Sequence, residues 1–283
     1  YGPGDIGALS SDFTRTIWRG IVAVDILGKL LHETRPHEKR KGETDKVYQE
    51  CLDKVSRIVE TDSSQMYAYM WEVRDKFRAI EVDRTKRPII GIVGEIYMRS
   101  HPFGNRDIIR KIEDLGGQVW LAPIGEWMLY TTNRFVQKSI REKKYLDLFK
   151  GYMQDVFQRS DEKRLHEPFK DTLVFGEDPA IKEILKNASP YIKDTFEGEA
   201  ILSVGKAVDY AEKGMSGVVN IMPFSCMPGT VVAALSKKVR EDMNDIPWLN
   251  LDYDGVEETN TQTRLEAFMY QASQYRGKMV LSL

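Results

Sequence analysis

With 283 residues, the chain is long enough for one large domain or two modest ones. Hydrophobic residues make up 42% of it and charged residues 30%, which allows a sizeable core beneath a charged surface. The 41 Lys and Arg residues nearly balance the 43 Asp and Glu residues, so no overall basic field favours nucleic acid as a partner. No apolar stretch approaches the roughly 20 residues that span a bilayer, which argues against a membrane protein.

The cysteine content and the chain's opening residues give two further expectations. Two cysteines, Cys51 and Cys226, provide no disulfide framework, and we therefore expect a reducing, cytoplasmic location. The chain opens with Tyr1 and shows no signal-peptide pattern, so we interpret it as a piece of a longer polypeptide.

Residues 1–86 predict a helical section without strands. Apolar residues recur at helical spacing over residues 12–31, again from Thr44 onward, and a third helix is expected over 63–79. Cys51 lies on the apolar stripe of the second helix, which predicts a buried thiol that packs as a small hydrophobe.

Residues 87–283 predict an α/β domain. Residues 89–94 form a short continuous apolar run typical of a buried strand, and Asn105 can cap the helix that leads to a second strand at 119–122. After a charged, helical insertion over about 126–171, strands at 217–222 and 247–252 alternate with helices at 198–213, 229–241 and 260–276. This alternation predicts a small doubly wound, Rossmann- or flavodoxin-like parallel sheet.

The insertion also carries many aromatic residues among lysines and arginines, a mixture that can bind single-stranded nucleic acid. Their helical spacing favours instead an amphipathic face that packs in the core, with the basic residues on the solvated side. The residues concerned are Trp127, Tyr130, Phe135, Tyr145, Phe149, Tyr152 and Phe157.

Cys226 lies in the segment Pro223–Gly229, between a predicted strand and a predicted helix. Its neighbours are turn-forming residues, and the carboxyl ends of strands in an open α/β sheet are where ligands bind. Spacing alone nevertheless favours a packed loop thiol, because free cysteines are so often buried. The segment is incomplete as a metal site, since it holds no second cysteine and no nearby histidine.

A second constellation, Gly94–Asn105, follows the first strand of the sheet directly. Glu95, Tyr97 and Arg99 are expected to leave the sheet at the same edge as Cys226 and suit a polar ligand. Alternatively, Glu95 and Arg99 satisfy the loop backbone or each other, and spacing does not separate these two interpretations. The four histidines show no metal-ligand spacing.

These segments carry a resemblance to a known family. The chain resembles the 2-hydroxyacyl-CoA dehydratase D-component family, and within it the dehydratase-like part of large CoA-substrate-specific enzyme activases of the type that activates 2-hydroxyglutaryl-CoA dehydratase. The resemblance covers most of residues 87–276, and its most specific part is the Cys226 loop. The matching segments are 94–99, 102–105, 115–117, 126–127, 199–209, 217–220, 223–230 and 263–268.

The resemblance implies an iron–sulfur protein of anaerobic metabolism, built from Rossmann-like domains. In such proteins, cysteines from different segments hold a cluster of the 4Fe–4S type near an acyl-CoA or other small molecule, and an ATP-dependent activase supplies a low-potential electron. Cys226 matches a cluster cysteine. The other cluster cysteines of the pattern belong upstream of this chain, Cys51 lies in no matching motif, and the activase's ATP-binding phosphate loop is missing.

We therefore expect a C-terminal fragment of a dehydratase-like or reductase-like iron–sulfur enzyme, or of its fused activase, that is inactive alone. The rest of the polypeptide or a partner subunit would supply further cysteines. Two alternatives stay open: a non-catalytic module that docks on an activase or partner subunit through its first 86 residues, and metal-free thiol chemistry at Cys226. No catalytic residue is assigned. Besides Cys226 as the metal ligand, the expected substrate or cluster pocket consists of Glu95, Tyr97, Arg99, Asn105, Pro223, Phe224, Ser225, Met227, Gly229 and Thr230.

Overall fold

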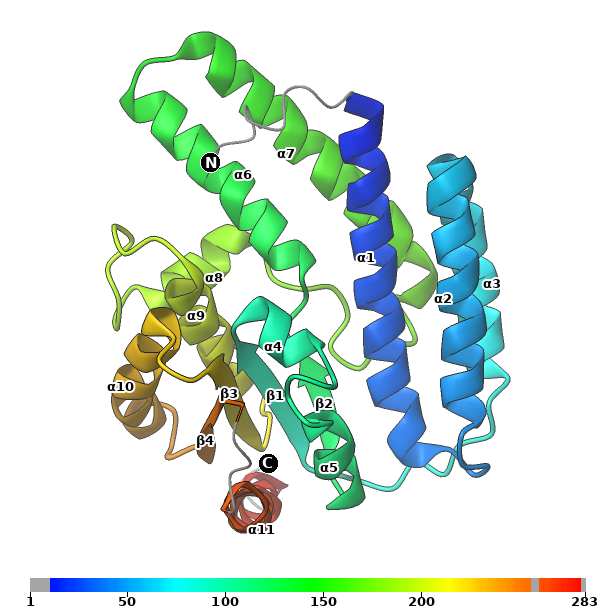
Figure 1. Cartoon of the computed structure of the whole chain (residues 1–283), viewed down its shortest axis with the longest axis vertical. Coiled ribbons are helices and arrows are strands. Elements are labelled where there is room, and N and C mark those ends of the chain that lie inside the picture. Colours follow the sequence, from blue (N-terminus) through cyan, green and yellow to red (C-terminus); the bar gives the residue numbers. More distant parts are fainter. Residues whose placement is uncertain (1–10, 256–259, 281–283) are drawn as a thin grey trace. The chain divides into compact units, whose positions relative to one another are not determined.

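A computed structural model of the chain describes residues 11–255 and 260–280 (Figure 1). The opening residues, on which the interpretation as a piece of a longer polypeptide depends, lie outside these ranges. The chain divides into two compact units, each made of two stretches of sequence. Unit 1 comprises Tyr1–Asp83 and Pro123–Ile181, and unit 2 comprises Arg84–Ala122 and Lys182–Leu283.

Unit 1 is helical. Its first stretch contains α1 (Ser11–Thr34), α2 (Glu43–Thr61) and α3 (Met66–Arg78), which confirm the three helices expected there. Its second stretch contains α6 (Gly125–Arg141) and α7 (Tyr145–His166), which form an antiparallel hairpin (Figure 1). Short 3-10 turns follow α1, α2 and α7 at Arg35–His37, Ser63–Gln65 and Glu167–Phe169.

The structure differs from the expected domain organisation in one respect. Residues 126–171 were expected as an insertion within the α/β domain, but α6 and α7 belong to unit 1, where α7 packs against α1 and α3. The face of α1 that carries Trp18, Val22 and Ile26 is buried within this unit, whereas Phe13 and Ile17 of the expected apolar repeat are exposed. Cys51 on α2 is buried, as expected. Phe13, Ile17 and Trp71 leave apolar surface exposed in the first 86 residues, so docking through this section stays a prediction.

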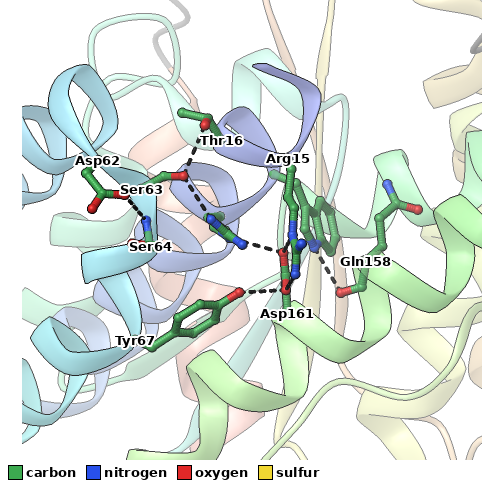
Figure 2. A network of polar contacts seen from close by, with 10 residues as sticks. Arg15, Thr16, Asp62, Ser63, Ser64, Tyr67, Gln158 and Asp161 are labelled. Carbon is green, nitrogen blue, oxygen red and sulfur yellow. Dashed lines mark hydrogen bonds and ion pairs between the residues drawn. The ribbon is translucent and has the colours of Figure 1, made fainter. Parts of the chain in front are cut away.

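A buried carboxylate joins the two stretches of unit 1 (Figure 2). Asp161 of α7 accepts two hydrogen bonds of 2.7 Å from Arg15, one of 3.1 Å from Arg19 and one of 2.6 Å from the Tyr67 hydroxyl. Trp18 also donates to the Gln158 carbonyl at 2.9 Å. These contacts fix α7 against α1 and α3 through a charge that has no access to water.

Unit 2 is built on a four-stranded parallel sheet. Its strands are β1 (Ile89–Gly94), β2 (Gln118–Leu121), β3 (Gly217–Pro223) and β4 (Trp248–Tyr253), in the order β2-β1-β3-β4. Each strand was predicted to within one or two residues. From β1 the chain continues to β2 on one side of β1, and it later returns to β3 on the other side. The connections therefore diverge between β1 and β3.

Helices cover both faces of the sheet. On one face, α5 (Ile108–Asp114) and α11 (Thr261–Val280) pack on a core that includes Ile90, Ile92 and Ile221. On the other face lie α9 (Glu199–Glu212) and α10 (Met227–Asp242). Gly91 faces α9, and a Cβ there would come within 2.1 Å of the Tyr210 ring.

Two short helices were not expected from the sequence, α4 (Ile96–Ser100) and α8 (Ile181–Ala188). The first lies inside the segment that was expected to be a loop after β1. Among the described residues, no helix combines the length and the apolar character that crossing a membrane requires.

Candidate functional site

The two segments singled out in the sequence leave the sheet at one edge of unit 2. β1 and β3 are parallel neighbours, with Gly94 beside Ile221, and the Glu95 N–H donates to the Ile221 carbonyl at 2.9 Å. The Glu95 and Cys226 segments therefore emerge side by side, which confirms their expected common edge. This edge lies where the connections diverge, the usual place for a ligand in an open α/β sheet.

A tight turn presents Cys226. The Cys226 N–H donates to the Pro223 carbonyl at 3.1 Å, and Ser225 has a φ of 61°, as at the third position of a type II turn. Thr230 donates to the Cys226 carbonyl from both its N–H and its hydroxyl, each at 2.9 Å. The backbone of Cys226 is thereby fixed at the start of α10, while its side chain makes no capping hydrogen bond.

The surroundings of Cys226 are open. Cys226 is half-buried, whereas Phe224, Ser225 and Met227 around it are exposed. Sequence spacing alone favoured a packed loop thiol, but the structure leaves Cys226 partly exposed. The exposed fractions of Phe224 and Met227, 64% and 68%, leave large apolar surfaces in water beside the sulfur atom.

Gly229 has a different role from the one expected. It is buried, and a Cβ there would come within 2.4 Å of the Met222 sulfur on β3. Its missing side chain lets α10 approach the sheet closely, so Gly229 serves helix–strand packing and does not line a pocket.

Three of the expected pocket residues hold their own loop. The Glu95 carboxylate caps α4 by accepting hydrogen bonds from the N–H groups of Tyr97 and Met98, at 3.1 and 2.7 Å. Arg99 is only 4% exposed and donates to the Gly94 carbonyl at 2.8 Å. The Asn105 amide donates to the Met98 carbonyl at 2.8 Å. These contacts support the interpretation in which Glu95 and Arg99 satisfy the loop backbone.

Tyr97 differs from these three residues because it lies on the surface. Its ring is 61% exposed and stacks on the His101 ring with 4.7 Å between centroids. Together with Phe224 and Met227, it gives this edge of the sheet an apolar and aromatic character.

Glu199, the first residue of α9, was not selected as a site residue from the sequence. Burial raises the pKa of its carboxyl group, the negative charge of Glu95 raises it further, and Arg99 and the Ile96 N–H act in the opposite direction. Glu199 thus belongs to the same polar group as the β1 loop. Its place at a helix start was the available signal, but many acidic residues occupy such positions for capping alone.

The chain does not by itself fit a complete iron–sulfur cluster, which normally takes about four thiolates. It has two cysteines, and Cys51 lies in unit 1, where burial raises the pKa of its thiol. The described residues contain no group of three or more His, Cys, Asp or Glu side chains arranged to hold a metal. Unit 2 can therefore offer one accessible thiol ligand.

The aromatic residues of α7 contradict the expected core face. Tyr145, Phe149 and Tyr152 are 76%, 65% and 61% exposed, and Phe157 is exposed too. Tyr145, Phe149 and Tyr152 lie on one side of α7, and Phe157 lies under the Arg15 guanidinium of α1. The helix approaches α6 through Gly151, where a Cβ would come within 2.9 Å of Phe135. Tyr130 on α6 is buried, as expected.

A second polar constellation lies in unit 1, in a cavity of about 340 Å³. Its titratable residues come from α1, α6, α7 and the segment after α7, including Asp25, Lys29, Glu162, His166 and Asp178. Sequence analysis missed it because these residues form no local motif and meet only when α1 and α7 pack together.

Comparisons with known proteins identify no relative: no protein-family model, no curated protein and no solved structure matches the chain. The resemblance to the dehydratase family stays a prediction.

Proposed function

We propose that unit 2 is one α/β domain of an iron–sulfur protein of the 2-hydroxyacyl-CoA dehydratase type or of its fused activase. In this proposal Cys226 is one ligand of a cluster, and the other thiolates come from outside these 283 residues. The chain is inactive alone, and in the complete protein an ATP-dependent activase supplies the electron.

The observation that carries the proposal is the placement of Cys226. Its thiol lies in a turn at the carboxyl end of β3, with a fixed backbone, no side-chain cap bond and exposed neighbours. A metal ligand needs this combination of rigid support and an open side for the metal and the remaining ligands.

The topology supports a doubly wound, flavodoxin-like domain. The strand order β2-β1-β3-β4 is parallel throughout, and helices cover both faces of the sheet. In folds of this kind the ligand lies beyond the strand ends where the connections diverge, here between β1 and β3.

The exposed apolar surface beside the thiol supports a pocket that is completed by another group. Phe224, Met227 and Tyr97 leave large side chains in water at this edge. An acyl-CoA-type molecule, or the segment that carries the other cysteines, would cover them and gain apolar contact.

Anaerobic reconstitution of the full-length protein tests this proposal. We expect Cys226→Ala to lower the iron and sulfide bound per chain and to change the electron paramagnetic resonance signal of the reduced cluster. Cys51→Ala is the matched control, since that thiol is buried in unit 1, and its iron and sulfide content is expected to equal that of the unaltered protein. Undiminished iron and sulfide in Cys226→Ala would reject the proposal.

A docking module is the second candidate function, and the exposed face of α7 favours it. Tyr145, Phe149, Tyr152 and Val156 form an apolar stripe on that face. Beside the stripe, α1 and α7 line a cavity of about 410 Å³ that includes Trp18 and Phe157. Lysines and arginines dominate the tip of the α6–α7 hairpin, so an acidic helix of the activase or of a partner subunit would complement it.

A titration of the chain with the purified activase, or with the remainder of the full-length polypeptide, tests docking. We expect the double variant Phe149→Ser, Tyr152→Ser to weaken binding at least about tenfold, because exposed aromatic anchors dominate such interfaces. Tyr270→Ser on α11 is the control, since Tyr270 is 69% exposed but lies in unit 2. Equal affinities of the double variant and the unaltered chain would exclude α7 as the docking face.

A further inference from the structure

The cavity of about 340 Å³ in unit 1 is a site that neither the sequence motifs nor the proposed function of unit 2 uses. It opens between α1, the start of α6 and the last turns of α7. Apolar side chains such as Val22, Leu129 and Ile181 form part of its wall, and charged side chains form the rest. Its volume is at the lower end of the range for small-molecule sites, about 300–1,000 Å³, which suits a small ligand.

His166 contributes an unused hydrogen-bond acceptor. The residue is 4% exposed, and its Nδ1 lies 3.1 Å from the Glu162 carbonyl one turn earlier in α7. Because a carbonyl only accepts, Nδ1 carries the proton in this contact. Burial, and then the positive charge of Lys29, lower the pKa of His166 to about 4, so the ring is neutral at pH 7. The buried Nε2 is then a lone-pair acceptor, and it has no hydrogen-bond partner among the residues that the structure describes.

Two carboxyl groups add further acceptors. Asp25 of α1 accepts hydrogen bonds from the N–H groups of Ile124 and Gly125, at 3.0 and 2.8 Å, and thereby also fixes the start of α6. Each of its oxygens retains capacity for another donor. Glu162 lies in the cavity wall on the same helix as His166. Burial raises the pKa of Asp25 to about 6 and that of Glu162 to about 7.

Two of the cations in the cavity wall form ion pairs of their own. Lys29 forms an ion pair with Asp178, and Arg159 pairs with Asp155 on its own helix at 2.8 Å. Lys163 is exposed and can extend into water. Lys29 and Arg159 thus each have a carboxylate partner in an ion pair, while their charges also act on Glu162, and that of Lys29 on Asp25.

We infer that this cavity binds the primary ammonium group of a small alkylamine, with Glu162, Asp25 and His166 Nε2 as its acceptors. A –NH₃⁺ group offers three N–H donors and no acceptor, which complements a wall that offers acceptors. The alkyl chain would lie against the apolar part of the wall.

Other ligand classes fit less well. An anion would meet an imidazole lone pair and a wall in which acidic side chains outnumber basic ones. The acidic ones are Asp25, Glu126, Glu162, Glu177 and Asp178, and the basic ones are Lys29, Arg159 and Lys163. A metal ion needs its ligands within about 2.0–2.6 Å, and the described residues contain no suitable group of three. An ammonium group binds through longer hydrogen bonds of about 2.7–2.9 Å and tolerates a wider arrangement of acceptors.

Isothermal titration calorimetry of the whole chain with n-butylamine and 1,4-diaminobutane tests the inference. We expect saturable binding to one site for both. Tetramethylammonium, which has the charge but no N–H donor, and 1-butanol, which has no charge, are expected not to bind. A lysine blocked at both its α-groups is a further arm, and saturable binding of its side-chain ammonium at the same site would support the ammonium site.

Two variants assign the binding to this cavity. Glu162→Gln keeps the shape of the protonated carboxyl and is expected to weaken n-butylamine binding about tenfold or more, through loss of a charge-assisted hydrogen bond. His166→Leu is expected to weaken it about fivefold by removing one acceptor. Glu167→Gln is the matched control, because Glu167 is exposed and pairs with Lys170 outside the cavity.

Several outcomes would overturn the inference: no saturable heat with either amine, equal binding of tetramethylammonium or 1-butanol, or unaltered affinity in both Glu162→Gln and His166→Leu. Circular dichroism melting of each variant verifies that it is folded. Cys226→Ala is expected to leave amine binding unchanged, since Cys226 lies in unit 2, so a failure of the cluster proposal and a failure here are distinguishable.

Discussion

Burial in the unit 1 cavity raises the pKa of Glu162 from its ordinary value to near neutral pH. Burial, and then the negative charge of Asp178, raise the pKa of Glu162 to about 7, against the opposing charges of Lys29 and Arg159. An unfolded glutamate has a pKa of about 4.3. Between these values the folded chain binds more protons than the unfolded chain. The protonated carboxyl therefore costs little at low pH, and Glu162 destabilises the folded chain increasingly as pH rises from about 4.3 to about 7.

Glu162→Gln is therefore expected to raise the free energy of unfolding at pH 8 by roughly 1–3 kcal/mol and to leave it nearly unchanged at pH 4. Urea unfolding at both values, followed by circular dichroism, measures the difference. His166 changes the profile in the opposite sense, because a depressed histidine pKa costs stability as pH falls from about 6.5 towards 4. For that reason the variant is compared with the unaltered chain at each pH. An equal change in the free energy of unfolding at pH 4 and pH 8 would contradict the raised pKa of Glu162.

Among the helices of unit 1, Asp161 is the contact on which the packing of α7 against α1 and α3 depends (Figure 2). Burial alone would raise the pKa of its carboxyl, but hydrogen bonds from Arg15 and Tyr67 and the charges of Arg19 and Arg15 lower it overall. Its stabilising effect is thus present near neutral pH and is lost as the carboxyl becomes protonated in acid.

Asp161→Ala is expected to lower the free energy of unfolding by about 3–5 kcal/mol, since it leaves Arg19 buried without its anion. Urea unfolding measures this loss of stability, and hydrogen exchange of the α1 amides shows whether it occurs at the contact with α7. Asp155→Ala on the same helix is the control, because its ion pair with Arg159 is partly exposed and such pairs contribute only about 0.3–0.5 kcal/mol. Similar losses in the two variants would show that the buried network has no special role.

The same helix shows how a pattern is misinterpreted. Helical spacing of Tyr145, Phe149 and Tyr152 correctly predicted that they share one face of α7, but it cannot say whether that face meets a partner helix. Gly151 decides the matter, because its missing side chain lets α6 approach from another direction. The aromatic face is then left exposed, which makes it a candidate interaction surface.

For the molecule as a whole, both units are discontinuous in sequence. The chain completes α1–α3, leaves for β1 and β2, returns for α6 and α7, and then finishes the sheet. The change of pattern near residue 87 correctly marked the first crossing into the α/β unit. The return could not be located in the same way, because a helical segment carries no sign of which neighbours it will pack against.

Periodicity and local chemistry determined much of this protein in advance: the four strands, the main helices, the buried Cys51, and the common edge of the Glu95 and Cys226 segments. Each depends on residues close together in sequence, where the repeat of a helix or strand fixes which side chains share a face. Tertiary structure alone decided that Glu95, Arg99 and Asn105 hold their loop, that Gly229 serves packing, and that α7 completes unit 1. It also brought together the charges around His166. These outcomes depend on contacts between residues far apart in the chain, which no local pattern encodes.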